Sequence, residues 1–519
     1  MLDWYVLKLE SKRVEKNGRK CKSSLQYLPA NCRENRTPLF QAEPYHRICA
    51  DTQITISDDR KEKGTMKRVL AVAAGQDSSR KGESLIRKKL KYLNFGLLGL
   101  VTMIDQYSDR SAVMFQADDL TVEQLISEIE GAGFDLSRDF ECVLLSIPSY
   151  HSISWCERFC THIKKCYGLK IIVGGRWVVD QHSRWVLEKL RYADAVSEGF
   201  GERFMAEYFD FSGDKNAFCG EKNCFQFVDY TLLHHYRDYH PNIEISRGCG
   251  CGCHFCADKN NRRLPNKPAT TVMKELERLD QVYGRYTAYL TAPHFSFDPE
   301  WLGAFYKLMA KRPEPVLWRC TSRVESVPLD KLALLRDSGL KIIDVGLESA
   351  SVTQLARMHK TSNPQKYLEQ ASKLLNACWE NKIWVKLNIL LYAGETMETV
   401  RETTQWLLRH KACIKDISAG SLVYYYNMDN LRELEQLGAS ISADDHFEDD
   451  GFAMMNLSPE IPKEKAAELC LEIPQLIASQ RDFYDVKSFS YYPSSYSYDD
   501  FMRDVRMCSP RELPFYVEE

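Results

Sequence analysis

The chain has 519 residues, too many for one hydrophobic core, so two or three domains are expected. It is 44% hydrophobic and 27% charged, as soluble globular proteins are, and its net charge of −3 demands neither a nucleic acid nor an anionic membrane as a partner. No apolar run approaches the roughly 20 residues of a membrane-spanning helix, and the N-terminal stretch MLDWYVLKLESKRVEKNGRK does not have the pattern of a secretory signal. We therefore expect a cytoplasmic protein, whose clustered cysteines bind metal or do chemistry rather than form disulfides.

Residues 1–65 are polar and show no sustained hydrophobic period. We interpret them as a polar extension, either disordered or the product of an upstream start codon. The pattern changes at Met66, where MKRVLAVAAGQD gives a short apolar run that ends in small residues. Such a run is typical of a first buried parallel strand, so the folded chain is expected to begin there.

Residues 66–205 alternate between short apolar runs and amphipathic stretches, which predicts a doubly wound, Rossmann-like parallel sheet. The expected strands are RVLAVAA, SAVMFQ, ECVLLSI, KIIVGG and DAVSEG, and helices are expected between them. Ligands of such sheets bind at the carboxyl ends of the strands. Those ends are Ala73–Asp77, Ser146–Tyr150, Gly174–Trp177 and Glu198–Gly201.

An aromatic-rich stretch, residues 206–240, is interpreted as a linker to a second alternating region, residues 241–428. Six β/α units there predict an incomplete (β/α)6 barrel, whose chemistry lies at the carboxyl ends of its strands. Residues 429–519 form a small C-terminal region whose tyrosine-rich patch, FSYYPSSYSYDDF, could pack on the barrel mouth. The expected barrel strands are 242–246, 287–291, 316–321, 341–346, 385–391 and 416–425.

Four cysteines stand within eight residues directly after the first barrel strand, in the stretch EISRGCGCGCHFCADKNNRRLP. Cys249, Cys253 and Cys256 form C-x3-C-x2-C, and Cys251 is the odd one out. A disulfide knot over so few residues would be strained, and a structural zinc site usually takes four ligands in two separated pairs. Three closely spaced thiolates suit a [4Fe–4S] cluster with one iron left open.

This spacing, after a first strand and before a barrel, resembles the radical S-adenosylmethionine (SAM) superfamily. The resemblance implies that Cys249, Cys253 and Cys256 hold a [4Fe–4S] cluster, and that the open iron takes the amino and carboxylate groups of SAM. An electron from the cluster would then cleave SAM to a 5′-deoxyadenosyl radical. Cluster potentials extend to about −700 mV, the strongly reducing range that this cleavage needs, whereas zinc is redox-silent.

Later barrel segments also resemble the family, namely LWRCTSRVESV, GLKIIDVGLESAS with LARMHK, and KLNILLYAGETMETV. The last of these departs from the family's glycine–any–proline–glycine–glutamate–threonine pattern at Leu391 and Ala393. The resemblance implies SAM contacts from Phe255, Thr291, Pro293, Glu348 and Asn388. Glu348 could instead form a barrel-wall salt bridge, and Asn388 could instead cap the backbone.

The first domain resembles the cobalamin-binding domain that precedes many radical SAM barrels, through LLSIPS, KIIVGGRW and ADAVSEGFGE in that order. The resemblance implies cobalamin contacts from Ser146, Gly174, Gly175, Glu198 and Gly199, although the two glycines could simply make a tight turn. The chain has no Asp-x-His-x-x-Gly signature, so the lower axial position is expected to hold water or nothing.

The resemblance implies a cobalamin-dependent radical SAM methyltransferase acting on a small molecule or peptide, usually in natural-product or modified-peptide biosynthesis. An electron donor such as flavodoxin or ferredoxin is the implied partner. Alternatives are a radical SAM cyclase, deoxygenase or rearrangement enzyme with a scaffold first domain, and a non-catalytic partner or sensor protein. We do not expect RNA methylthiolation, because such enzymes carry three further cluster cysteines in the first domain, whereas Cys156, Cys160 and Cys166 stand on one predicted helix.

Overall fold

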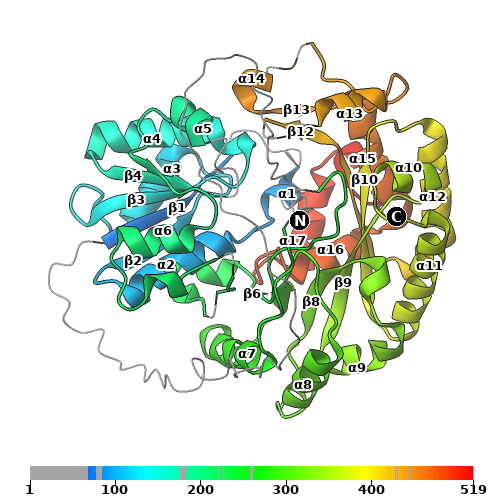
Figure 1. Ribbon diagram of the computed structural model, residues 1–519, viewed down its shortest axis with the longest axis horizontal. Helices are drawn as coiled ribbons and strands as arrows, with labels where there is room; N and C mark the ends of the chain where they lie inside the picture. The colour runs from blue at the N-terminus through cyan, green and yellow to red at the C-terminus, as the bar shows by residue number, and fades with distance from the viewer. Residues whose placement is uncertain are drawn as a thin grey trace, which may run out of the picture. The chain divides into compact units, whose positions relative to one another are not determined.

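The computed structural model describes residues 68–517 (Figure 1), apart from residues 77–83, 176–182, 221, 226, 257–260, 427, 429, 444 and 446. All described residues belong to one compact unit. The expectations for residues 1–65 lie outside the described residues. None of the described helices is long and apolar enough to cross a membrane.

The first domain is a parallel five-stranded sheet in the order β2-β1-β3-β4-β5, which confirms the predicted doubly wound fold. Helices α2 and α6 cover one face, and α3, α4 and α5 cover the other (Figure 1). With both faces covered, a strand such as β1 is a nearly continuous apolar run rather than an alternating one. The elements are β1 Arg68–Ala73, α1 Leu85–Lys88, α2 Phe95–Tyr107, β2 Ser111–Gln116, α3 Val122–Gly131, β3 Phe140–Ser146, α4 Ile153–Tyr167, β4 Lys170–Gly174, α5 Ser183–Lys189, β5 Ala195–Val196 and α6 Gly201–Tyr208.

The second sheet has six parallel strands in the order β11-β10-β9-β8-β7-β6, the sequential order of a partial (β/α)6 barrel. Its fold class agrees with the prediction, and the strands follow the predicted ranges closely. Its elements are β6 Asn242–Glu244, α7 Ala269–Tyr283, β7 Ala288–Thr291, α8 Pro299–Met309, β8 Trp318–Ser322, α9 Leu332–Asp337, β9 Leu340–Glu348, α10 Val352–Arg357, α11 Pro364–Glu380, β10 Trp384–Leu391, α12 Met397–Arg409 and β11 Asp416–Ser421.

The predicted last strand, 416–425, is two strands in the structure. β11 ends at Ser421, and β12 (Val423–Tyr425) leaves the barrel to pair antiparallel with β13 (Phe452–Met454). The segment predicted as a linker begins inside α6 and is hydrogen-bonded to the first domain, because the His234 amide donates to the carbonyl of Met114 at 2.8 Å.

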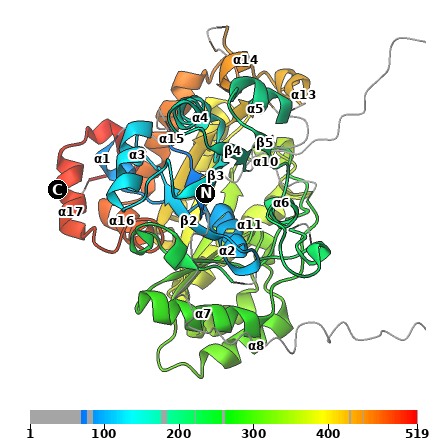
Figure 2. The ribbon, with the colours of Figure 1, turned by 90° about the vertical axis from the view of Figure 1, so that its left-hand side faces the viewer.

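The C-terminal region adds α13 (Leu431–Gln436), α14 (Phe447–Asp450), α15 (Lys463–Ile477), α16 (Gln480–Ser488) and α17 (Tyr498–Arg506). Helix α15 packs along β11, and α17 lies beside α1 of the first domain (Figure 1 and Figure 2). Ser490 and Tyr491 of the tyrosine-rich patch line the large cavity described below, and the packing of the whole patch on the barrel mouth stays a prediction. The end of α16 reaches Arg319 near the start of β8, where the Val486 carbonyl accepts from the guanidinium at 3.2 Å.

Candidate active site

One cavity of about 1420 Å³ opens at the carboxyl ends of both parallel sheets. Every residue that the sequence assigned to the cluster, SAM or cobalamin lines it, except the exposed Glu198. These assignments to particular cofactors stay predictions, but the fold brings the residues to one space. The predicted lining residues are Ser146, Gly174, Gly175, Gly199, Cys249, Cys253, Phe255, Cys256, Thr291, Pro293, Glu348 and Asn388.

The cysteine loop depends on glycine. Gly248, Gly250 and Gly252 alternate with the cysteines and have φ of +72°, +72° and +71°, in the left-handed region that L side chains rarely adopt. A Cβ on Gly248 would lie 2.2 Å from the Arg262 carbonyl oxygen. The tight approach lets the Cys249 amide donate to the Asn261 carbonyl at 3.0 Å, which ties the loop to the chain that follows it.

The four thiols of this loop do not share one direction. Cys249, Cys253 and Cys256 line the cavity, whereas Cys251 is absent from its lining and lies with its Sγ 3.7 Å from His294 Nδ1. Cys249, Cys251 and His294 also form a group whose ligand atoms lie within 4.8 Å of one another. Cys249 belongs to both sets, and only the three cavity-facing thiols match C-x3-C-x2-C. Soft thiolates on a glycine-rich loop fit an iron–sulfur cluster.

Arg323 supports the loop from the end of β8, and the sequence reasoning missed it. Its Nη1 lies 3.1 Å from Cys253 Sγ, and its Nη2 donates to the Lys360 carbonyl at 2.5 Å. An arginine two residues after the predicted barrel strand 316–321 was the available signal. The guanidinium brings a fixed positive charge to one predicted cluster ligand.

Glu348 ends β9 with φ +66°, an uncommon conformation for a side-chain-bearing residue, and is buried. Its Oε1 pairs with Lys360 Nζ at 3.1 Å, so the salt bridge considered as an alternative is present. Lys360 Nζ also lies 5.9 Å from the ring centre of Phe255. The predicted SAM contacts of Glu348 and Phe255 are therefore linked through one lysine.

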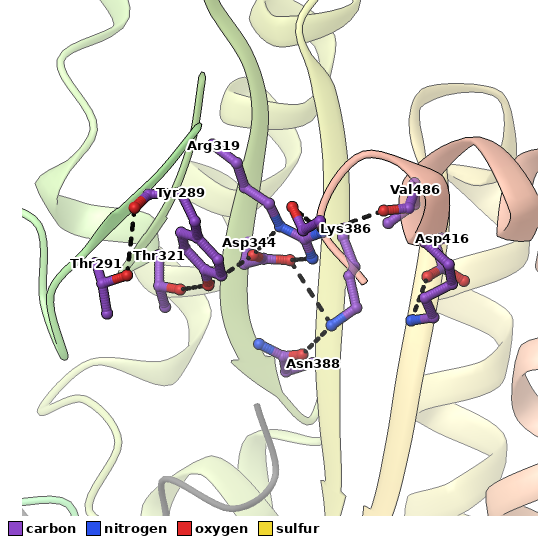
Figure 3. Close-up of polar contacts among 11 residues, drawn as sticks. Tyr289, Thr291, Arg319, Thr321, Asp344, Lys386, Asn388, Asp416 and Val486 are labelled. Carbon is purple, nitrogen blue, oxygen red and sulfur yellow. Dashed lines mark hydrogen bonds and ion pairs between the residues drawn. The ribbon is translucent and has the colours of Figure 1, made fainter. Parts of the chain in front are cut away.

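Asn388 is held by a buried charged network inside the barrel (Figure 3). Lys386 Nζ donates to Asn388 Oδ1 at 2.8 Å and lies 3.7 Å from Asp344, which takes two 2.6 Å hydrogen bonds from Arg319. Burial lowers the pKa of Lys386 to about 8, although Asp344 opposes the shift. Burial alone would raise the pKa of Asp344, but Arg319 and Lys386 hold it below its usual value.

The first-domain wall of the cavity is built from two adjoining strand ends. The Ile147 amide donates to the Gly174 carbonyl at 2.8 Å, and Ser146 Oγ accepts from Asn94 Nδ2 at 2.9 Å. Gly175 has φ +115°, and a Cβ there would lie 2.7 Å from the Ile147 oxygen, so this position requires glycine. Asn94, which caps α2 and lines the cavity, was missed, although asparagine before a helix is a recognisable cap.

The first-domain cysteines are separate from this site. Cys156 and Cys160 are buried in α4, as expected for helix-borne structural cysteines, while Cys166 is exposed at its end. Burial raises the pKa of Cys160, and likewise that of Cys142 in β3, to about 12. The lining of the large cavity includes none of Cys142, Cys156 and Cys160, so these thiols are separate from the candidate site.

Arg247, between β6 and the cysteine loop, contacts both domains. Its guanidinium donates to Glu244 at 2.8 Å, to Glu202 of α6 at 2.6 Å and to the Gly220 carbonyl at 2.7 Å. The rings of Phe200 and Phe225 lie 5.0 and 4.8 Å from the guanidinium carbon. Arg247 thus ties the start of the cysteine loop to the first domain.

The sequence model of the Radical SAM superfamily matches residues 243–407, which include the cysteine loop and the barrel strands β7 to β10. The chain therefore carries a radical SAM domain, and [4Fe–4S] and SAM are the cofactors that such a domain uses.

Solved structures of one protein are similar in fold to this chain over the first domain as well as the barrel. The fold is similar to that of the radical SAM methyltransferase TsrM from Kitasatospora setae, solved with tryptophan substrate and a SAM analogue. The TM-score is 0.59 at 13% identity, over 85% of this chain and 100% of that one. The same protein with cobalamin and a [4Fe–4S] cluster bound gives a TM-score of 0.53 at 13% identity, over 79% and 88%.

Part of the chain is also similar in sequence to the ribosomal protein uS12 methylthiotransferase RimO of Methylorubrum populi, with 28% identity over 187 residues. That match covers 33% of this chain and 41% of the relative, so the chain spans less than half the length of the curated relative it matches.

Proposed function

We propose that this protein is a cobalamin-dependent radical SAM methyltransferase that acts on an unactivated carbon of a small molecule or peptide, in natural-product or modified-peptide biosynthesis. The observation that carries the proposal is the cavity that both domains line. Cys249, Cys253 and Cys256 stand on its barrel side, and the Gly174–Gly175 turn stands on its first-domain side.

The volume of the cavity supports a site for more than one ligand. Pockets for one drug-sized molecule occupy about 300–1,000 Å³. At about 1420 Å³ this cavity exceeds that range, as a space for a large cofactor together with SAM and a substrate would. Its walls contain both polar strand ends and aromatic side chains, among them Phe255, Tyr289 and Tyr491.

In this proposal the cluster supplies the electron that cleaves SAM, and cobalamin supplies the carrier of the methyl group. The chain's own residues bind and orient the reactants. The thiols of the cysteine loop hold the cluster, with Arg323 beside Cys253. Glu348 and Asn388, fixed by Lys360 and Lys386, present polar groups to SAM. The missing Cβ of Gly175 lets the turn pack closely against the Ile147 backbone, so that the backbone of Gly174 and Gly175 itself forms the cavity wall offered to cobalamin.

The methylthiotransferase likeness does not favour a second candidate. It covers only 33% of this chain, and the described first-domain cysteines Cys142, Cys156 and Cys160 are buried and lie outside the cavity lining. A reductant such as flavodoxin or ferredoxin and a small-molecule or peptide substrate are the partners we propose.

The test is anaerobic reconstitution with iron, sulfide and hydroxocobalamin, followed by measurement of iron and cobalt per protein. SAM with a labelled methyl group is then added with a reductant. We expect S-adenosylhomocysteine, from methylation of the cobalt, in addition to 5′-deoxyadenosine. A protein that retains its cluster and forms 5′-deoxyadenosine, but binds no cobalt, would overturn the methyltransferase proposal in favour of a radical enzyme with a scaffold domain.

Gly131 and Gly175 give a control and a test position for the cobalt measurement. Gly131 ends α3 outside the cavity lining, and an added Cβ there would meet nothing within 4 Å, so Gly131→Ala should bind cobalt as the wild type does. Gly175→Ala forces the strained φ and the clash with Ile147, and should lower cobalt binding while iron content is retained.

A further inference from the structure

A second group of metal-ligating side chains lies outside the large cavity. It is formed by α3 and by the residues that follow Leu233, which bridges to Met114 of β2. Glu128 of α3 faces His234 and His235, and these three residues line a separate pocket of about 380 Å³. Glu128 Oε1 lies 3.6 Å from His234 Nε2 and 3.9 Å from His235 Nε2. One ligand atom from each residue lies within 4.8 Å of the other two.

These separations match the edges of a tetrahedral metal site. Zinc binds imidazole nitrogen and carboxylate oxygen at about 2.0–2.2 Å, and a tetrahedron of that size has edges of about 3.3–3.6 Å. The two carboxylate–imidazole separations, 3.6 and 3.9 Å, are close to these edges, and the third edge, between the two imidazoles, is no longer than 4.8 Å.

The backbone brings two consecutive imidazoles to the same side of the chain. Neighbouring residues of an extended segment point in opposite directions. Here His235 has φ +54°, and the ring centres of His234 and His235 lie 3.8 Å apart. The His234 ring also stacks on Phe115 of β2 at 4.5 Å, and its amide bonds to Met114, so this ligand is fixed on the sheet.

We propose that Glu128, His234 and His235 bind a divalent transition-metal ion of the zinc class. Two imidazoles and one carboxylate favour such an ion over magnesium or calcium, which prefer ligand sets made of oxygen. Water completes the coordination, because the side chain of His235 is 62% exposed. The ion would fasten the segment between the domains to α3 of the first domain. This inference does not depend on the proposed methyl transfer.

The test uses the reconstituted full-length protein, from which unbound metal ions are removed before titration with Zn²⁺. Zinc and iron per chain are then measured by elemental analysis after gel filtration. We expect one zinc per chain beyond the cluster iron. Glu128→Gln and His235→Ala should each weaken zinc binding at least tenfold with iron content unchanged. Glu130→Gln is the matched control, since it lies on the same helix two residues away and points to another side.

The cysteine loop is the competing zinc site, and a second variant separates it. In a chain with Cys249, Cys251, Cys253 and Cys256 all replaced by alanine, zinc binding should persist, and Co²⁺ should give the visible absorption of a tetrahedral site. Loss of that absorption on adding His235→Ala supports the assignment. Zinc binding that disappears with the four cysteines, or that Glu128→Gln and His235→Ala leave unchanged, would overturn it.

Discussion

At the scale of single residues, Cys251 separates two possible ligand sets. Its thiol lies at His294, away from the cavity that the other three thiols of the loop line. A cluster with one open iron needs three thiolates, so replacing Cys249, Cys253 and Cys256 together by alanine should abolish iron loading and SAM cleavage. Cys251→Ala should leave both largely intact.

His294→Ala is the matched variant for this prediction, because it removes the other side chain of the alternative set. It should also keep the iron. Iron content and the visible absorption of the cluster are the measurements. If Cys251→Ala and His294→Ala both lose iron, the ligands are Cys249, Cys251 and His294.

Arg323 should set the redox potential of the cluster. Its guanidinium lies 3.1 Å from Cys253 Sγ, and hydrogen bonds and charge near the sulfurs shift cluster potentials. A positive charge stabilises the more negative, reduced cluster. Arg323→Met should therefore lower the midpoint potential, by roughly 50–100 mV if a charged hydrogen bond of about 1.5–3 kcal/mol is partly lost.

The measurement for Arg323 is a redox titration followed by electron paramagnetic resonance, with iron content as the check on folding. Arg323→Lys keeps the charge but loses the forked geometry, so its potential should lie between the two. An unchanged midpoint in Arg323→Met, with full iron loading, would show that the contact with Cys253 is structural only.

At the scale of elements, the turn between β10 and α12 contains a buried carboxyl. Burial raises the pKa of Glu395 to about 7, although hydrogen bonds from Thr399 at 2.6 Å and from the Tyr392 amide at 3.2 Å oppose the shift. The folded chain then holds this proton at pH values where the unfolded chain has lost it. Stability from this group is present below about pH 4.5 and is lost as pH rises to about 7.

Glu395→Gln should remove this pH dependence. The shift corresponds to at most about 3 kcal/mol between about pH 5 and about pH 8. Denaturant unfolding of wild type and variant at both pH values isolates the Glu395 contribution, because other groups cancel in the difference. Equal differences in unfolding free energy at the two pH values would contradict the assignment.

The elements were predictable where the chain's local pattern decides them. Strands such as β4 are buried on both faces, so their apolar runs stand out in the sequence. The division of 416–425 into β11 and β12 could not be predicted, because an apolar run does not reveal which strand it will pair with. The candidate cluster cysteines stand out because their C-x3-C-x2-C spacing is local in the sequence, and their role as ligands stays a prediction. The sequence does not reveal the contacts of Arg323, Lys360 and Asn94, because they join distant segments. Glu198 was expected at a strand end because DAVSEG was interpreted as the strand, whereas β5 ends at Val196.

At the scale of the whole molecule, several contacts join the first domain to the rest of the unit, among them the packing of α17 beside α1, an aromatic group and an arginine. An aromatic group links Tyr150 and Trp185 of the first domain to Tyr425 and Tyr426 beyond the barrel. The arginine is Arg247, which joins β6 and the cysteine loop to α6. Since both domains line one cavity, these contacts determine how the proposed cofactors face each other.

Arg247 should therefore matter for both stability and cofactor retention. Its side chain is only 10% exposed, and those of Glu202 and Glu244 are 7% and 14% exposed. Arg247→Leu leaves two buried carboxylates without their cation, which typically costs about 3–5 kcal/mol. We expect a lower unfolding free energy and reduced retention of both iron and cobalt, since the change loosens the start of the cysteine loop and its tie to the first domain.

Adding Glu202→Gln and Glu244→Gln to Arg247→Leu should recover part of the stability, because the buried charges are then gone. The measurements are denaturant unfolding and metal content after gel filtration. An Arg247→Leu chain whose unfolding free energy stays within about 0.5 kcal/mol of wild type would show that the two domains hold together without this contact.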